Sequence, residues 1–423
     1  MSLDLRNPAA VCAAAGLTAP DVWRNSWPQS ARSFEPRNVF FLKPDYVAET
    51  CATLRIAPEL TAALADCAGV VAQDEALPRL VWHLHWLLSL SGLDVGSWPA
   101  PSLEAHPANA LLYGLVVLAG VPRMMETNAA RGIDPEDSIE TLSDLETWAT
   151  DYHTWEGVYR FPTVGWMQHH LRGRLFKLGR LEYLPGTYGH PFRWYRQRKT
   201  GAVVALAQGG LLMREDGQFA NADDGAVRTG LWMTALRESD TEITGHPCTP
   251  QGAVLPATVT LDTAEWWEIL RQGDPVMTVH IPSKGRMGPE ECGASFRRAV
   301  EFYGRHFPDV VWRAFTCHSW LLDPQFEQMD PAPPNIVAWL REWYLHPAQG
   351  ANDQQTWERT FDLFGRSQPD WQNATPRTSI QRALVSFVQQ GGRPRSGASV
   401  LFPEDLDWGA QTYRVARHPG MIP

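Results

Sequence analysis

Residues 273–344 read GDPVMTVHIPSKGRMGPEECGASFRRAVEFYGRHFPDVVWRAFTCHSWLLDPQFEQMDPAPPNIVAWLREWY. The apolar, β-branched run Pro275–Pro282 predicts a strand, and the loop Ser283–Gly288 separates it from Pro289, a residue suited to the first position of a helix. A second strand is predicted at Val310–Cys317, and a second helix follows it. Two strands joined through a helix are expected to be parallel, so this stretch predicts one strand–loop–helix–strand–helix unit.

The loop Ser283–Gly288 is a candidate anion site. It joins the carboxyl end of a strand to the amino end of a helix, where backbone N–H groups and the helix dipole favour negative charge. Lys284, one of only four lysines in the chain, and Arg286 lie in this loop. The alternative is that these are ordinary loop cations, since the loop contains neither GxxxxGK[ST] nor GxGxxG. A phosphate site and a plain surface loop therefore both stay open.

Reactive side chains lie at the ends of the two predicted strands. His280 ends the first strand, and Cys317, His318 and Ser319 end the second. Side chains alternate between the two faces of a strand, so His318 should face away from Cys317 and Ser319. A pair of Cys317 with His280 across the two strands stays open, as does a proton-transfer role for either histidine. The alternative for each histidine is a structural hydrogen bond to a loop carbonyl.

The rest of the chain predicts an α/β (α+β) protein. Apolar residues recur at helical spacing before residue 165, and strand-like alternation begins near Phe176. We therefore expect a helical N-terminal domain over residues 1–165, followed over 166–423 by a mixed β-sheet flanked by helices.

Three shorter segments also give local predictions. Thr263–Gln272 predicts a helix and Trp357–Phe364 a strand, while Ala207–Pro256 is expected to contain a long functional loop.

Composition excludes several classes of partner. The 37 basic and 47 acidic residues give a net charge of −10, which does not favour nucleic acid or an anionic membrane surface. The N-terminal residues lack the pattern of a signal peptide and the apolar runs are short, so we expect a cytoplasmic protein with no membrane partner. The six cysteines lack CxxC spacing and the histidine pairs do not converge, so no metal site is expected.

The chain resembles a family of bacterial acyltransferase-domain proteins, which combine an N-acyltransferase N-terminal domain with a GNAT-like C-terminal domain. The segments that resemble the family are HIPSKGRMGP (280–289), ASFRRAVEFYGRHFP (294–308), CHSWLLDP (317–324), PPNIVAW (333–339) and, upstream, LRGRLFKLGRLEYL (171–184). The resemblance extends over roughly residues 140 to 415.

This resemblance implies a GNAT-like acyltransferase that moves an acyl group from acyl-CoA, its co-substrate, to an amine or hydroxyl of a small-molecule acceptor by direct transfer. It implies that the pantetheine arm lies between the two predicted strands and that the pyrophosphate lies on the following loop. The residues assigned to CoA by the resemblance are Ser283, Lys284, Gly285, Arg286 and Gly288. The candidates for acid and base catalysis are His318, His280, Ser319 and Cys317.

Two alternatives accompany this hypothesis. One is an acyl-enzyme transferase or hydrolase that depends on Cys317, and the other is a catalytically silent protein of GNAT-like fold that binds a small ligand. The segment KGRMGPEECGA departs from the GNAT signature [QR]xxGx[GA]. Whether the Ser283–Gly288 loop binds a pyrophosphate separates the alternatives. The acyl group, the acceptor and the oligomeric state are not predicted.

Overall fold

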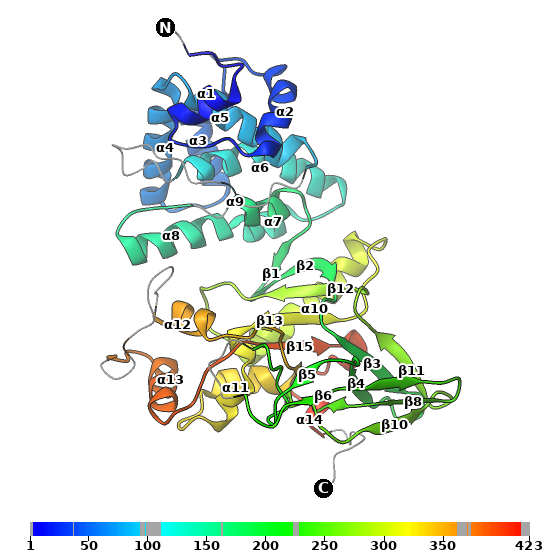
Figure 1. Ribbon diagram of the computed structural model, residues 1–423. Coiled ribbons are helices and arrows are strands. Elements are labelled where there is room, and N and C mark those ends of the chain that lie inside the picture. Colours follow the sequence, from blue (N-terminus) through cyan, green and yellow to red (C-terminus); the bar gives the residue numbers. More distant parts are fainter. Residues whose placement is uncertain are drawn as a thin grey trace. The chain divides into compact units, whose positions relative to one another are not determined.

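A computed structural model describes residues 3–36, 38–93, 98, 111–161, 164–222, 228–361, 370 and 374–415. The chain divides into two compact units, Met1–Leu178 and Gly179–Pro423 (Figure 1). The first unit is helical and the second contains the β-sheets, which confirms the predicted fold class. The domain boundary between residues 165 and 166 stays a prediction.

The first unit is built from nine α-helices in its described part. They are α1 (Pro8–Ala14), α2 (Asp21–Ala31), α3 (Pro44–Thr53), α4 (Pro58–Gln73), α5 (Leu77–His85), α6 (Leu112–Ala130), α7 (Pro135–Leu142), α8 (Asp144–Glu156) and α9 (Val164–Leu171). The short helices η1 (Phe40–Leu42) and η2 (Trp86–Leu90) and the strand β1 (Phe176–Leu178) complete it. Ten consecutive residues of α6, Leu112–Val121, are buried, so this helix lies at the centre of the helical core. Among the described helices, none is long and apolar enough to cross a membrane.

A buried arginine joins two helices of this unit. Arg79 of α5 is 1 % exposed, and its guanidinium lies 4.0 Å from the centre of the Trp27 ring of α2. It donates to the Trp27 carbonyl and to Ser30 Oγ, both at 3.0 Å. These acceptors lie near the C-terminal end of α2, where the helix dipole favours a cation. Arg79 therefore caps a neighbouring helix from inside the core.

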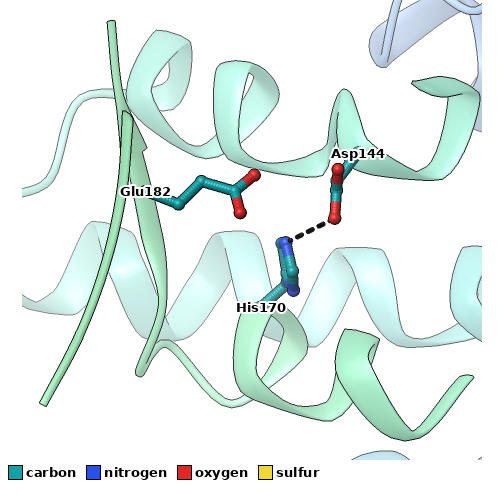
Figure 2. A group of neighbouring side chains, drawn as sticks. All are labelled: Asp144, His170 and Glu182. Atoms are coloured by element: carbon teal, nitrogen blue, oxygen red, sulfur yellow. Dashed lines mark ion pairs between the residues drawn. The ribbon is translucent and has the colours of Figure 1, made fainter. Parts of the chain in front are cut away.

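A buried acid and histidine join two further helices. Asp144, the first residue of α8, has Oδ2 3.4 Å from Nε2 of His170 in α9 (Figure 2). The indole N–H groups of Trp148 and Trp166 donate to the same oxygen at 3.1 and 3.0 Å. Burial alone would raise the pKa of Asp144, but His170 and the two indoles outweigh burial and lower it. The carboxylate therefore stays ionised inside the helical unit.

The main sheet of the second unit has the strand order β2 (Leu181–Thr187), β12 (Pro275–His280), β13 (Phe315–Ser319), β15 (Gly397–Leu401) and β14 (Tyr344–His346). The pair β12 and β13 is parallel, as predicted, and the other pairs are antiparallel. The second strand begins at Phe315, five residues later than predicted.

The second unit also contains two smaller sheets, a separate pair of strands and five α-helices in its described part. A second sheet has the order β11 (Trp266–Leu270), β3 (Phe192–Gln197), β4 (Val203–Ala207) and β9 (Pro247–Cys248), and a third has the order β10 (Val259–Asp262), β8 (Glu242–Gly245) and β7 (Leu236–Glu238). The strands β5 (Leu212–Met213) and β6 (Trp232–Met233) form a separate pair. The helices are α10 (Pro289–His306), α11 (Pro334–Arg341), α12 (Gln354–Phe361), α13 (Ser379–Gln389) and α14 (Thr412–Val415).

Three local predictions are corrected by the structure. Thr263–Gln272 contains strand β11 and not a helix, because a bulge between Glu268 and Leu270 buries the consecutive residues Ile269 and Leu270 and so imitates helical spacing. Of the strand predicted at Trp357–Phe364, residues 357–361 belong to helix α12, and residues 362–364 lie outside the described part of the chain. Ala207–Pro256 contains the short strands β5 to β9 in its described part, so it is not one long loop, and its functional role stays a prediction.

One face of the main sheet packs on α10 through Phe296. The ring centre of Phe296 lies 4.9 Å from that of Phe315 in β13 and 5.8 Å from that of Tyr183 in β2. The hydroxyl of Tyr303, two turns further along the same face of α10, donates to the Tyr183 carbonyl at 2.9 Å. Gly293 lets Trp408 approach, since a Cβ at this position would lie 2.7 Å from the indole. Phe296 is therefore the centre of the core between the sheet and α10.

Replacing Phe296 with alanine should lower the free energy of unfolding by about 3–5 kcal/mol, because it removes a fully buried ring and leaves a cavity. Denaturant titration followed by tryptophan fluorescence measures this change. Val300, on the same helix but 36 % exposed, is the matched control, and Val300→Ala should cost less than about 1 kcal/mol. Similar losses in the two variants would contradict this assignment of the core.

Candidate functional site

The two parallel strands separate before they end. The ladder between β12 and β13 pairs Met277 with Phe315 and Thr278 with Thr316. Beyond this point β12 stays paired with β2 as far as His280, and β13 stays paired with β15 as far as Ser319. The next pair of the parallel ladder would be Val279 with Cys317, but in these two strands the ladder ends before it. Each strand therefore follows its outer partner, and the sheet opens between them.

The register also decides which side chains share a face. Residues that pair directly across strands point to the same side of a sheet. Thr278 pairs with Thr316, so His280 and His318, two residues further along each strand, point to the side of this pair. Cys317 points to the opposite side. This geometry argues against the pair of Cys317 with His280 that the sequence left open.

Cys317 and Ser319 have structural surroundings. Cys317 is 3 % exposed, and burial raises the pKa of its thiol to about 12. A thiol with so high a pKa is protonated at neutral pH and is a poor nucleophile. The hydroxyl of Ser319 accepts from the backbone N–H of Leu321 at 3.2 Å and so caps the short helix η4 (Trp320–Leu322).

His318 is the most accessible of the predicted catalytic residues. It is exposed, and its Nε2 lies 3.2 Å from the hydroxyl oxygen of Ser396, just before β15. The protein atoms around its ring lower the pKa of His318 below its ordinary value. A lowered pKa keeps this imidazole neutral at physiological pH, so it can accept a proton.

Two further histidines lie beside His318. The ring centre of His190, from the β2–β3 connection, lies 5.9 Å from that of His318 and 4.6 Å from that of His346 in β14. His318 and His346 both pair with Ala398 of β15, one from each side, so they share a face of the sheet. Burial, followed by the nearness of His318, lowers the pKa of His190 to about 4.

A chain of hydrogen bonds fixes the proton on His346. Its Nδ1 lies 2.9 Å from the Pro347 carbonyl, which can only accept, so Nδ1 is the donor. Its Nε2 is then an acceptor for the Tyr188 hydroxyl at 3.4 Å, and that hydroxyl accepts from the indole of Trp194 at 2.9 Å. His346 is 1 % exposed, and burial lowers its pKa well below the ordinary value. His346 is therefore a buried, neutral residue in ring contact with His190.

His280 lies on the strand that leads to the candidate phosphate loop. Its Nε2 lies 3.1 Å from the Thr278 hydroxyl, which also donates to the Leu184 carbonyl at 2.7 Å. The same hydroxyl hydrogen cannot serve both acceptors, so a proton on Nε2 of His280 completes the arrangement. His280 pairs with Glu182 across the β2–β12 ladder.

The Ser283–Gly288 loop is held from beneath by Arg180. The guanidinium of Arg180 donates to the carbonyls of Gly285 and Arg286 at 3.2 and 3.0 Å. In a trans peptide the N–H points opposite to the carbonyl, so the N–H groups of Arg286 and Met287 point away from Arg180. Gly285 has φ +97°, a conformation that favours glycine. Ser283, Lys284, Gly285 and Arg286 are all exposed, as binding to a phosphate requires.

A carboxylate already lies at the start of α10. Gly288 is the N-cap residue and offers no side chain to the helix. A Cβ placed on Gly288 would lie 1.8 Å from Oε2 of Glu291, so this carboxylate folds back over the cap position. Negative charge is favourable at a helix N-terminus. The Glu291 carboxylate therefore lies where a phosphate bound to the N-terminus of α10 would lie.

Sequence reasoning named His318 and His280 but missed His190, His346, Ser396 and Arg180. His190 and His346 each precede a proline, but so do His106, His246 and His418, so this signal does not discriminate. Their convergence depends on the sheet order, in which β15 lies between β13 and β14.

Two family models match the chain. A GNAT-like C-terminal domain matches residues 175–401, and an N-acyltransferase N-terminal domain matches residues 45–173. No curated protein matches the sequence.

Several solved structures share the fold. One is an acyltransferase in complex with decanoyl-CoA and teicoplanin, which has a TM-score of 0.63 and 21 % identity, with 94 % of this chain and 99 % of that chain covered. Another is an acyltransferase mutant in complex with octanoyl-CoA, with a TM-score of 0.62, 20 % identity and 93 % and 99 % covered. A third, with CoA and a teicoplanin derivative, has a TM-score of 0.61 and 22 % identity, with 94 % and 99 % covered.

The GNAT-like match alone covers more than half of the 423 residues, and the N-acyltransferase match lies directly before it. The chain therefore belongs to the family of proteins with an N-acyltransferase N-terminal domain and a GNAT-like C-terminal domain.

Proposed function

We propose that this protein is an acyltransferase that moves an acyl group from acyl-CoA to an amine or hydroxyl of a small-molecule acceptor by direct transfer. The observation that supports this most strongly is the end of the β12–β13 ladder at Thr278 and Thr316, directly before the Ser283–Gly288 loop. Backbone groups that face an opening in a sheet require hydrogen-bond partners. The two amide groups of pantetheine are suitable partners, and they would direct the thioester toward the histidine-bearing face.

The loop supplies the other half of the CoA site in this proposal. The N–H groups of Arg286 and Met287, which point away from Arg180, and the start of α10 would bind the pyrophosphate, and Lys284 and Arg286 add positive charge. Solved structures of the same fold contain CoA, octanoyl-CoA or decanoyl-CoA, which supports an acyl-CoA donor. Two of them contain teicoplanin or its derivative, which supports a small-molecule acceptor.

His318 is the general base in this mechanism. The acceptor nitrogen or oxygen attacks the thioester carbonyl while neutral His318 takes its proton. The tetrahedral intermediate then collapses, the carbon–sulfur bond breaks, and the proton returns from His318 to the departing thiolate. The products are an amide or ester and free CoA, so no acyl-enzyme is formed. His280, on the same face, is the second candidate for proton transfer.

Steady-state kinetics test the activity as a whole. Purified protein is incubated with acetyl-, octanoyl- or decanoyl-CoA and an acceptor panel that includes teicoplanin, and free thiol and acylated product are measured. We expect acceptor-dependent thiol release with a product of matching mass. Thiol release without an acylated acceptor would indicate a thioesterase and contradict the proposal.

Loop variants test the CoA site. Lys284→Ala and Arg286→Ala should each weaken CoA binding about three- to tenfold, because each removes a charge from an exposed phosphate site. Lys199→Ala, in an exposed turn, is the matched control and should leave the Kd unchanged. Glu291→Gln should tighten binding about two- to fivefold, because it removes a competing carboxylate from the helix N-terminus. Calorimetry measures the wild type and the four variants, and a folded wild type that gives no heat with millimolar CoA would refute the site.

The pH dependence tests His318. Because its pKa is lowered, the neutral form persists to lower pH, and kcat/KM for the acceptor should fall only below the ordinary histidine value of about 6.5. His318→Gln should lower kcat by about a hundredfold and remove this acid limb. His153→Gln, at an exposed position in the helical unit, should leave the profile intact. An unchanged acid limb in His318→Gln would exclude this residue as the base.

Cys317 distinguishes direct transfer from an acyl-enzyme route. Cys317→Ala should keep kcat within about twofold of the wild type, because a buried thiol of raised pKa is not the nucleophile. Cys248→Ala, at another buried thiol, is the matched control. Intact-mass spectrometry after incubation with decanoyl-CoA alone should show unmodified protein. A decanoyl adduct that disappears in Cys317→Ala would establish the acyl-enzyme alternative.

A further inference from the structure

Asp323, from the CHSWLLDP segment, is a buried acid to which the proposed chemistry assigns no role. It follows η4, five residues after His318, and is 1 % exposed. Its Oδ1 accepts from the backbone N–H and the side-chain amide of Gln325 at 3.0 and 3.1 Å. Its Oδ2 accepts from the backbone N–H of Arg395 at 2.9 Å. One carboxylate therefore joins the end of η4 to the chain that enters β15.

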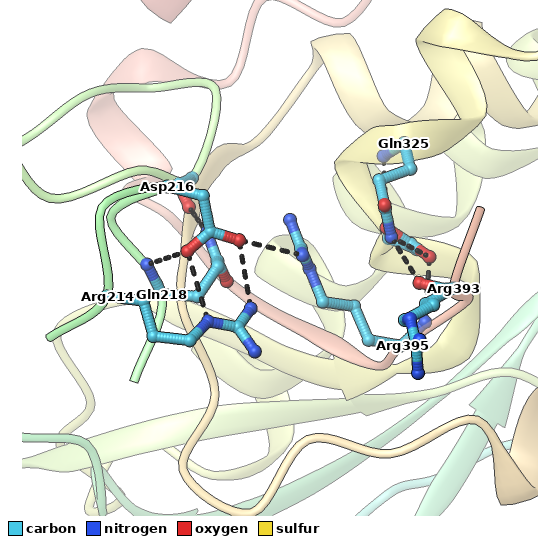
Figure 3. Close-up of polar contacts among 8 residues, drawn as sticks. Arg214, Asp216, Gln218, Gln325, Arg393 and Arg395 are labelled. Atoms are coloured by element: carbon cyan, nitrogen blue, oxygen red, sulfur yellow. Dashed lines mark hydrogen bonds and ion pairs between the residues drawn. The ribbon is translucent and has the colours of Figure 1, made fainter. Parts of the chain in front are cut away.

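Further contacts hold the same entering chain. The amide of Gln325 donates to the Arg393 carbonyl at 2.8 Å, and the guanidinium of Arg395 lies 3.5 Å from Asp216 (Figure 3). The guanidinium of Arg214 also forms an ion pair with Asp216, at 2.9 Å (Figure 3).

Two contacts at the start of β15 complete this arrangement. The backbone N–H of Ser396 donates to the Asn352 carbonyl at 3.0 Å. At Gly397 a Cβ would lie 2.1 Å from the Leu322 carbonyl oxygen, so the two backbones are in close contact.

The residue held by these contacts faces the candidate base. Ser396 follows Arg395 directly, and its hydroxyl lies 3.2 Å from His318 Nε2. Ser396 is 8 % exposed, so this hydrogen bond lies largely out of water. The position of the hydroxyl depends on the backbone at residues 395–397, which Asp323 and Leu322 fix. Ser396, the hydrogen-bond partner of His318, therefore lies in a segment that Asp323 holds through the Arg395 N–H.

We infer that Asp323 is a positioning residue for the reaction, which acts through Arg395 and Ser396 to orient the His318 imidazole. The inference rests on the proposed function of His318 as the base. Ser396 holds Nε2, and this fixes the plane of the ring and its distance from the acceptor. A displaced base slows proton transfer even when substrate binding is unchanged.

Isosteric substitution gives the test. Asp323→Asn keeps the volume of the side chain but places an NH₂ group or a weaker acceptor against the Arg395 N–H, so that contact is lost or weakened. Ser396→Ala removes the hydroxyl itself. Each variant should lower kcat about ten- to a hundredfold with an unchanged KM for acyl-CoA. The double variant should be no slower than the slower single variant, because both act through one contact.

Two controls separate positioning from loss of fold. Asp262→Asn replaces an exposed acid that accepts only from a local backbone N–H, that of Ala264, among its recorded contacts, and should leave kcat unchanged. If Asp323→Asn does not fold, Gln325→Ala replaces it, since this variant releases the Arg393 carbonyl and keeps the carboxylate. Thermal unfolding verifies that each variant compared is folded at the assay temperature.

A measurement on the histidine itself needs no activity. Nitrogen-15 NMR of the His318 ring, assigned with His318→Gln, reports its tautomer and pKa. Both should change alike in Asp323→Asn and Ser396→Ala and stay unchanged in Asp262→Asn. If the wild type transfers no acyl group but these ring signals change together, the proposed function fails and the positioning contact stands. If ring signals and kcat in folded Asp323→Asn equal those of the wild type, the inference is overturned.

Discussion

The early end of the pairing between β12 and β13 is the constraint on which the rest of the second unit depends. Each strand pairs over more residues with its outer neighbour, β2 or β15, than with its parallel partner. The antiparallel ladders persist to His280 and Ser319, whereas the parallel one stops at Thr278 and Thr316. A sheet that opens in its middle exposes backbone polar groups in the interior of a domain, which is costly unless a ligand meets them. The end of this ladder is therefore the feature on which the proposed CoA site rests.

The two faces of the sheet have different tasks because side chains alternate. One face, with Tyr183, Phe315 and Cys317, packs on α10. Burial on this face raises the pKa of the Cys317 thiol, which makes it a poor nucleophile. The other face presents His318 and His346, and His190 reaches it from a loop. Burial lowers the pKa of His190 and His346, so both imidazoles are neutral, and the Pro347 carbonyl holds the proton of His346 on Nδ1.

The sequence predicted the central unit well because its signals are local. Pro289 begins α10 as expected, the parallel pair has the expected order, and the alternation rule separated Cys317 from His318. The errors arose where non-local pairing decides the structure. The bulge in β11 buries Ile269 and Leu270 together only because β3 lies beside it. Ser396 contacts His318, and His346 contacts His190, through a sheet order that no local pattern encodes, so these contacts could not be predicted from the sequence.

The position of β15 has a consequence for how the protein is made. This strand lies between β13 and β14, although it follows both in the sequence and ends only at residue 401. During synthesis the ribosome releases β13 and β14 before the strand that separates them, so both must wait with an unpaired edge. Such edges are prone to association with other chains, and non-local pairing of this kind folds slowly. The described α-helices of the first unit, whose chain emerges first, form without pairing to a later strand, so the two halves of the polypeptide should mature at different times on the translating ribosome.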